Sequence, residues 1–318
     1  MPPRRRFGKR LIKSLLPIAF VIVLVFVGAL SFIVYCVSRP AKHPYVVTPE
    51  SFSRISGRAI KVTDENWTNL DGSHARGWLL KGAEGAPAVV LLHRYAGDRS
   101  WLFNLGVKIN ETTNFTILWP DLRGHGESPL VKWTSLGVRD GDDVIAALKY
   151  LRSLKTEGQR ALVGESFGVY GVEMGAYSAL KAARTEPQIK VLVLDSVVRS
   201  PDEMLSTAVA SCVNMDNSLV QYFSRVAVKF YMLGGYDNVD ACELAASIRD
   251  QRVLLLSGAE AGRLRDDTAS LHKCFPATGN VEVRTDLPLS GFSLPSATGE
   301  QGEAYDRVVI EFFARNLR

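Results

Sequence analysis

Apolar positions along the chain form short runs separated by polar and glycine-rich segments, with one much longer run near the start. The short runs predict buried strands, and between several of them apolar residues recur at helical spacing. Asn69–Ser73 is a turn signal between two of the runs. We predict strands at Arg58–Val62, Ala75–Leu80, Ala88–Leu92, Phe115–Trp119, Ala161–Val163, Lys190–Leu194, Arg252–Leu256 and Val281–Arg284, and helices at Arg99–Ile109, Asp140–Leu154, Gly171–Ala183 and Tyr305–Asn316.

Apolar strands that alternate with helices predict the fold class: α/β, with a mostly parallel central sheet that helices cover on both faces. Residues 57–318 are enough for one such domain. Residues 199–250 are more helical and lie between two predicted strands, so we expect a helical insertion at about that place. Residues 39–56 have the composition of a linker.

The long apolar run covers residues 14–38 and contains no charged side chain. At about 1.5 Å per residue, a helix of this length can cross a hydrocarbon core about 30 Å thick. A cleaved signal peptide is the alternative, but its apolar region is shorter, so we favour an uncleaved transmembrane anchor. Residues 1–13 are strongly basic, and by the positive-inside rule they form a cytoplasmic tail, with the main domain extracytoplasmic.

The formal net charge of +5 reflects this tail. Residues 1–13 hold six of the 38 Lys and Arg and no acidic residue, so the rest of the chain is close to neutral. The charge therefore indicates membrane topology, and no nucleic-acid partner is expected. We expect no cofactor or metal either, because the sequence contains no phosphate loop, dinucleotide-binding motif or zinc-type cysteine spacing.

The chain has four cysteines. Cys36 lies in the predicted anchor, and the other three are widely spaced. In an exported domain, Cys212 and Cys242 could form a disulfide, and buried free thiols are the alternative.

Ser166 is the candidate nucleophile. It lies in Gly164-Glu165-Ser166-Phe167-Gly168, between a predicted strand and a predicted helix. This is the pattern of a nucleophile elbow, in which Gly164 and Gly168 allow the backbone to turn sharply and the helix N-terminus faces a developing oxyanion.

Several motifs follow successive predicted strands: His93-Arg94-Tyr95-Ala96-Gly97, Asp121-Leu122-Arg123-Gly124-His125-Gly126-Glu127-Ser128, the Ser166 pentapeptide and Leu194-Asp195-Ser196. Together they resemble the α/β-hydrolase superfamily over nearly all of residues 57–318, in particular membrane-linked serine hydrolases and S33-type serine-peptidase-like domains. The resemblance implies that Ser166 attacks a carbonyl and that the N–H groups of Phe167 and Tyr95 stabilise the oxyanion. The family has Gly where this chain has Arg94. Three interpretations follow: the loop is reshaped, Arg94 makes a charged contact at the mouth of the pocket, or Arg94 is a surface arginine on a modified loop.

The other two triad positions depart from the family pattern. After the strand at Arg252–Leu256 the expected Asp is Ala261, so Glu260 is the candidate acid, with Asp195 as an alternative position. Phe292 stands where the family has its histidine, and His272 is the candidate base. The resemblance thus leaves two functions open. One is a membrane-anchored serine hydrolase of an ester, thioester or amide, whose partner is a small-molecule or acyl substrate that the sequence does not identify. The other is an inactive hydrolase-like domain that binds a ligand or a partner.

Overall fold

The structure is a computed structural model that describes residues 4–57, 59–215, 217–233, 235–294 and 299–318. The chain divides into two compact units, which we describe separately. One unit contains the N-terminal helix up to Val37 together with residues 205–236, and the other contains residues 38–204 and 237–318.

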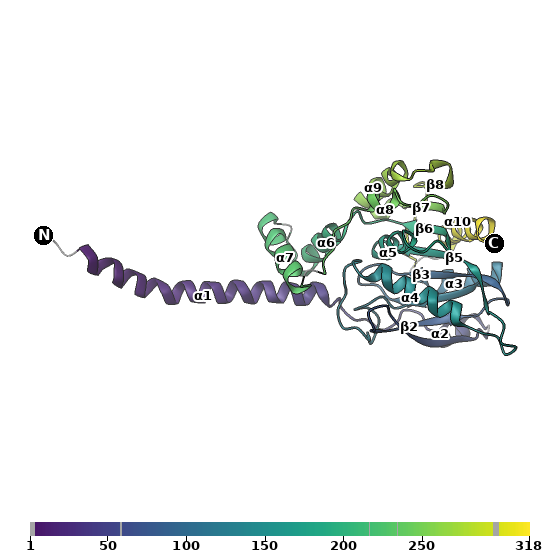
Figure 1. Ribbon diagram of the computed structural model, residues 1–318, viewed down its shortest axis with the longest axis horizontal. Helices are drawn as coiled ribbons and strands as arrows, with labels where there is room; N and C mark the ends of the chain where they lie inside the picture. Colours follow the sequence, from purple (N-terminus) through teal and green to yellow (C-terminus); the bar gives the residue numbers. More distant parts are fainter. Residues whose placement is uncertain (1–3, 58, 216, 234, 295–298) are drawn as a thin grey trace. The chain divides into compact units, whose positions relative to one another are not determined.

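The larger unit is built on one eight-stranded sheet with the order β1-β2-β4-β3-β5-β6-β7-β8 (Figure 1). β1 and β2 are antiparallel to each other, β2 is antiparallel to β4, and every other neighbouring pair is parallel. The mostly parallel sheet is therefore confirmed. Its strands are β1 Val62–Thr68, β2 His74–Leu80, β3 Ala86–Leu92, β4 Thr116–Pro120, β5 Val163–Val172, β6 Ile189–Asp195, β7 Arg252–Leu256 and β8 Val281–Arg284.

Helices cover both faces of the sheet, because the central strands are apolar on both sides. α4 and α5 pack together on one face, and α3 packs with α10 on the other, where Trp119 and Phe103 stack in the core. The helices of this unit are α2 Pro49–Ser56, α3 Phe103–Thr113, α4 Asp140–Ser153, α5 Met174–Ala183, α8 Ala241–Ala245, α9 Arg263–Leu271 and α10 Gly299–Asn316, with short 3₁₀ turns η1 Arg99–Leu102, η2 Ala259–Ala261, η3 His272–Cys274 and η4 Thr278–Asn280.

The first predicted strand is wrong. Residue 58 lies outside the described residues, residues 59–61 are not in a strand, and β1 begins at Val62. β1 pairs with β2 across the predicted turn at Asn69–Ser73. Because β1 is an edge strand, most of its side chains are at least partly exposed and its sequence is largely polar, so its apolar content gave no strand signal.

The smaller unit consists of α1 Arg4–Ser38 and a helical hairpin. The hairpin is formed by the end of α6 Pro201–Val213 and by α7 Ser218–Tyr231, in the segment where a helical insertion is expected. Residues 13–38 of α1 are long and apolar enough to cross a membrane. A disulfide joins Cys36 of α1 to Cys212 of α6.

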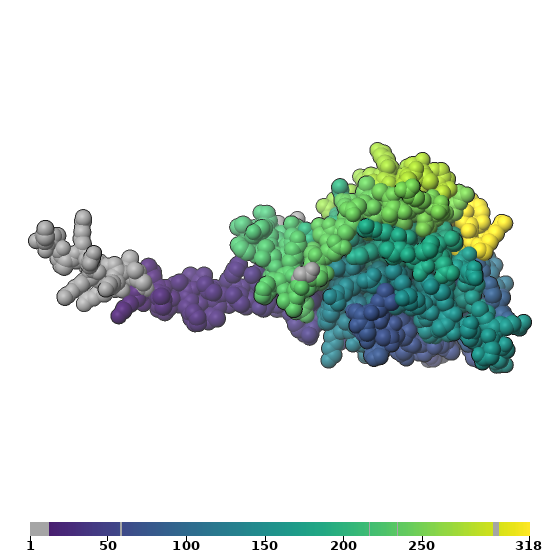
Figure 2. Space-filling model, viewed as in Figure 1, coloured from purple at the N-terminus to yellow at the C-terminus, as the bar shows by residue number. Residues whose placement is uncertain are grey.

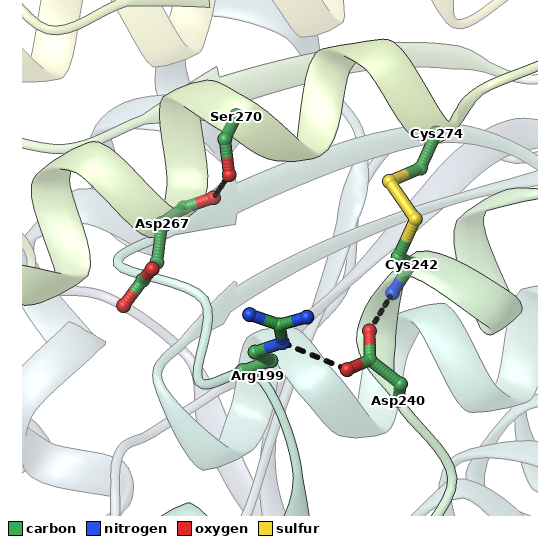
Figure 3. Close-up of a disulfide and its surroundings, with 6 residues drawn as sticks. All are labelled: Arg199, Asp240, Cys242, Asp267, Ser270 and Cys274. Carbon is green, nitrogen blue, oxygen red and sulfur yellow. Dashed lines mark hydrogen bonds and ion pairs between the residues drawn. A yellow bond between two sulfur atoms is a disulfide. The ribbon is translucent and has the colours of Figure 1, made fainter.

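A second disulfide joins Cys242 of α8 to Cys274 of η3 (Figure 3). The Asp240 carboxylate accepts hydrogen bonds from the Cys242 N–H and from Arg199, each at 2.8 Å, and so fixes the start of α8. The expected pairing of Cys212 with Cys242 is therefore wrong, and so is the alternative of free thiols. The actual pairing depends on contacts between helices that are distant in sequence.

Candidate functional site

The Ser166 pentapeptide lies inside β5 and not at its end. β5 continues to Val172, and its pairing with β3 shifts between Ala86 and Ala88, so that residues 164–166 form an irregularity at the start of the strand. The predicted strand-to-helix turn at Ser166 is therefore wrong, and Gly164 and Gly168 do not flank an elbow. Phe167 N–H donates to the Gln188 carbonyl at 2.9 Å, so it is not available as an oxyanion donor.

The strand-to-helix turn occurs at Glu173, between β5 and α5. Glu173 has φ 51° and ψ −106°, a backbone conformation that costs energy for a non-glycine residue. Gly171 and Gly175 make the turn possible: a Cβ on Gly171 would lie 2.4 Å from the Gly175 backbone, and one on Gly175 would lie 2.3 Å from the Leu92 carbonyl oxygen. Gly171-Val172-Glu173-Met174-Gly175 thus has the shape of a nucleophile elbow, with glutamate at the nucleophile position.

The Glu173 carboxylate binds the donor that was expected to stabilise an oxyanion. Tyr95 N–H donates to Glu173 Oε2 at 3.0 Å, and the N–H of Met174 also stabilises the carboxylate. Burial raises the pKa of Glu173 to about 7, although Arg94 and these N–H groups act in the opposite direction. Tyr95 therefore lies near the elbow, as we expected from the sequence. The second N–H group at the elbow belongs to Met174, whereas the sequence predicted Phe167.

Arg94 lies beside the elbow, between two aromatic rings. Its guanidinium carbon is 4.3 Å from the centre of the Trp101 ring and 5.5 Å from the centre of the Phe292 ring. Burial lowers the pKa of Arg94, and the nearby Glu173 carboxylate opposes this effect. Of the three interpretations of Arg94, the charged contact at the site fits this geometry.

Asp195, at the end of β6, is fully buried and accepts three hydrogen bonds. Its donors are the Gly291 N–H at 2.8 Å, the Ser196 hydroxyl at 2.6 Å and the Tyr305 hydroxyl. Burial raises the pKa of Asp195 to about 6. Because Gly291 precedes Phe292 and Tyr305 belongs to α10, Asp195 ties the Phe292 loop and α10 to the end of β6, which is a positioning role.

Comparison with solved structures identifies the architecture. An esterase of Pyrococcus furiosus superposes with a TM-score of 0.62 at 20% identity, covering 88% of this chain and 98% of the esterase. An esterase of Thermogutta terrifontis gives a TM-score of 0.54 at 16% identity, over 80% of this chain and all of that protein. The chain has the α/β-hydrolase fold.

A third neighbour, an acylaminoacyl peptidase of Pyrococcus horikoshii, has a TM-score of 0.59 at 16% identity. The match covers 84% of this chain and 44% of the peptidase. The sequence matches no protein-family model and no curated protein. At these identities the likeness establishes the fold, and the chemistry has to be argued from the residues of this chain.

The acid position of the α/β-hydrolase fold is held by the loop after β7. Glu260 lies there in η2, exposed, and its carboxylate accepts a hydrogen bond from the hydroxyl of Ser293. Ser293 directly follows Phe292, so the structure brings the expected acid and base loops together. Phe292, which stands where the resemblance led us to expect the base, has a phenyl ring that carries no proton-accepting group.

His272 is not at the base position. It follows α9, which runs back from the carboxyl ends of the parallel strands toward their amino ends, whereas Glu173 lies at a carboxyl end. The disulfide of Cys274 holds the η3 turn that contains His272 against α8 (Figure 3). The structure therefore does not bring His272 to the elbow.

Two buried histidines lie on the loops after β3 and β4. His93 Nε2 accepts a hydrogen bond from the Leu122 N–H at 3.1 Å, while its Nδ1–H donates to the Arg94 carbonyl at 2.8 Å. Burial lowers the pKa of both His93 and His125. His125 Nδ1 is 2.9 Å from the Arg123 carbonyl oxygen, within its own loop, whereas the two bonds of His93 join the two loops. Among the described residues, no group of three or more His, Cys, Asp or Glu side chains is arranged to hold a metal ion.

Proposed function

We propose that this chain is a membrane-anchored binding protein with the α/β-hydrolase fold that does not carry out acyl transfer. One observation carries the proposal: the carboxylate of Glu173, at the elbow, accepts the hydrogen bond of Tyr95 N–H. A substrate carbonyl would have to displace this carboxylate to reach the same donor, and the elbow would then offer it no hydroxyl nucleophile.

The other triad positions support the same conclusion. A serine hydrolase needs a base that removes the proton of its nucleophile, and Phe292 cannot do so. Loss of triad members costs on the order of 10⁴–10⁶ in rate, and the oxyanion hole retains only part of the catalysis when it is accessible. In this chain the carboxylate also fills the oxyanion hole.

A cavity in the larger unit supports a binding role. Its volume is about 380 Å³, within the range of small-molecule sites, and it lies between α2, α3 and α10. Trp101 lines this cavity, and its ring also contacts the Arg94 guanidinium. Charged side chains of Lys108, Glu111 and Asp306 line the cavity together with an apolar part, so its lining favours a small molecule with an apolar body and a polar group. The apolar part includes Val47, Phe52, Ile55, Leu105 and Leu294.

The experiment is fluorophosphonate labelling of the full-length protein in detergent. We expect no labelling of the wild-type protein and no change in Ser166→Ala, because neither protein has an activated serine. Glu173→Ser alone should remain unlabelled for want of a base, whereas Glu173→Ser with Phe292→His should gain labelling. An active serine hydrolase in the same tube shows that the probe is competent.

The serine-hydrolase alternative predicts the opposite result. If the folded wild-type protein is labelled and Ser166→Ala is not, Ser166 is an activated nucleophile and the proposal is wrong. Circular dichroism of each variant shows whether it is folded.

A further inference from the structure

The α7 stripe is an exposed row of large apolar side chains along one side of the hairpin. Its members within α7 recur at helical spacing on one side of the helix. Phe230 is 79% exposed and Leu233, just beyond the helix, is 86% exposed. The stripe consists of Leu219, Tyr222, Phe223, Val226, Phe230 and Leu233.

The opposite side of α7 is polar or buried and faces α6. Gln221 Nε2 donates to the Ser206 carbonyl at 3.0 Å, Arg225 reaches the Ser206 hydroxyl at 3.5 Å, and Val228 is buried. Two polar side chains of α7 are therefore bonded to α6, and the stripe lies on the other side of the helix. A soluble protein rarely exposes a continuous apolar row of this kind without a partner for it.

Two contacts within the smaller unit fix where the stripe lies along α1. The Cys36–Cys212 disulfide holds the end of α6 near the end of α1, and the Phe223 ring meets the Phe26 ring edge-on at 5.1 Å. The interval from Phe26 to Cys36 corresponds to about 15 Å along an α-helix, or half of a hydrocarbon core about 30 Å thick. From its disulfide to its stripe, the hairpin thus extends from the end of the apolar span toward its middle.

The direction of α7 differs from that of α1. Figure 1 shows α7 steeply inclined to α1 and not running along it. In Figure 2 the hairpin covers one part of α1 and leaves the surface nearer the N-terminus uncovered, where Val23 and Val25 are exposed apolar residues. The α7 stripe is therefore continuous with the exposed apolar surface of the span.

We propose that the α6–α7 hairpin is a second membrane element, with the α7 stripe buried in the outer half of the bilayer beside α1. This inference rests on the proposed function, in which α1 anchors the protein in a membrane. Lipid is the occupant that the geometry favours, because the stripe reaches the same level as the middle of the span. Lys229 is on the flank of the stripe, and its ammonium lies 5.3 Å from the centre of the Tyr236 ring.

The experiment measures the depth of single nitroxide labels in the full-length protein in nanodiscs of phosphatidylcholine and phosphatidylglycerol. All four native cysteines are in disulfides, so an introduced cysteine is the only one to be labelled. The test variants are Phe230→Cys and Val226→Cys on the stripe. Val23→Cys reports the span, and Glu157→Cys, at an exposed position of the larger unit, reports water.

Oxygen concentrates in the bilayer, whereas the nickel complex of ethylenediaminediacetate remains in water. We expect labels at 226 and 230 to collide several-fold more often with oxygen than with the nickel complex, as at position 23, and the reverse at position 157. A stripe that behaves like position 157 while position 23 is in lipid overturns the inference and leaves the anchor intact.

Low collision with both reagents at positions 226 and 230 would mean that protein covers the stripe, through a partner or a second copy, which also overturns the inference. Water-like behaviour at position 23 would show that α1 does not span, and the proposed anchoring would then fail as well. Fluorophosphonate labelling depends on none of these outcomes, so the non-hydrolytic function is tested separately.

Discussion

Replacement of Glu173 by glutamine tests whether the elbow carboxyl is held as the structure indicates. Burial raises its pKa from the ordinary value of 4.5 to about 7. Between these two values the folded protein keeps the proton while the unfolded chain has released it. The unfolded state then binds fewer protons, so stability falls as the pH rises from 4.5 to 7 and is level above that range.

The size of the effect follows from the shift. One pKa unit corresponds to about 1.4 kcal/mol, so this carboxyl makes the wild-type protein about 2 to 3 kcal/mol less stable at pH 8 than at pH 5. Glu173→Gln keeps an amide oxygen for the Tyr95 N–H and cannot titrate. The variant should therefore gain about 2 to 3 kcal/mol relative to the wild-type protein between these two pH values.

The assay is guanidinium unfolding of the full-length protein in detergent micelles at pH 5 and pH 8, followed by tryptophan fluorescence. Glu165→Gln is the matched control, because Glu165 is an exposed glutamate on the same strand. The reasoning is refuted if the difference between wild type and Glu173→Gln does not change with pH. A change of opposite sign would mean that the attraction of Arg94 for the carboxylate outweighs its burial.

Two further predictions concern the geometry of the elbow and the first disulfide. Gly171→Ala should destabilise the larger unit by about 1 to 3 kcal/mol in the same unfolding assay, because the added Cβ would overlap backbone atoms. The control is Gly158→Ala, which should cost much less because the nearest atom to its Cβ is 3.8 Å away. Equal costs for the two variants would contradict the turn at Glu173. Trypsin cleavage at the exposed Lys42 should leave the N-terminal fragment attached to the rest of the chain on a non-reducing gel, because Cys36 is bonded to Cys212. Release of that fragment without reductant would show that the disulfide is absent.

The sheet could be predicted from the sequence because burial on both faces leaves a plain signal. Strands such as Ala86–Leu92 and Arg252–Leu256 are nearly continuous apolar runs, and their predicted positions agree with the structure to within about two residues. β1 lacks this signal because it lies at the edge of the sheet.

The elbow could not be placed correctly because two glycine pairs have the same spacing. Gly164 and Gly168 flank a serine, which is the residue that the motif requires, while Gly171 and Gly175 flank Glu173. The useful signal was strand length: Ala161–Val163 is short for a buried strand, whereas Phe167–Val172 is an apolar run that leads directly into α5. The cysteine pairing had no comparable signal, since four cysteines allow three pairings.

The glutamate at the elbow also accounts for the turn that holds it. Donors that are arranged for an oxyanion are buried N–H groups, and a buried donor without an acceptor costs about 1–3 kcal/mol. Glu173 supplies that acceptor from within the chain, so Tyr95 N–H is bonded without any substrate. The strained φ of 51° directs the side chain toward the donors, as it would direct a nucleophile toward a carbonyl. The elbow in this chain therefore satisfies its own backbone, and in the function that we propose the same contact that stabilises the loop closes the site to acyl chemistry.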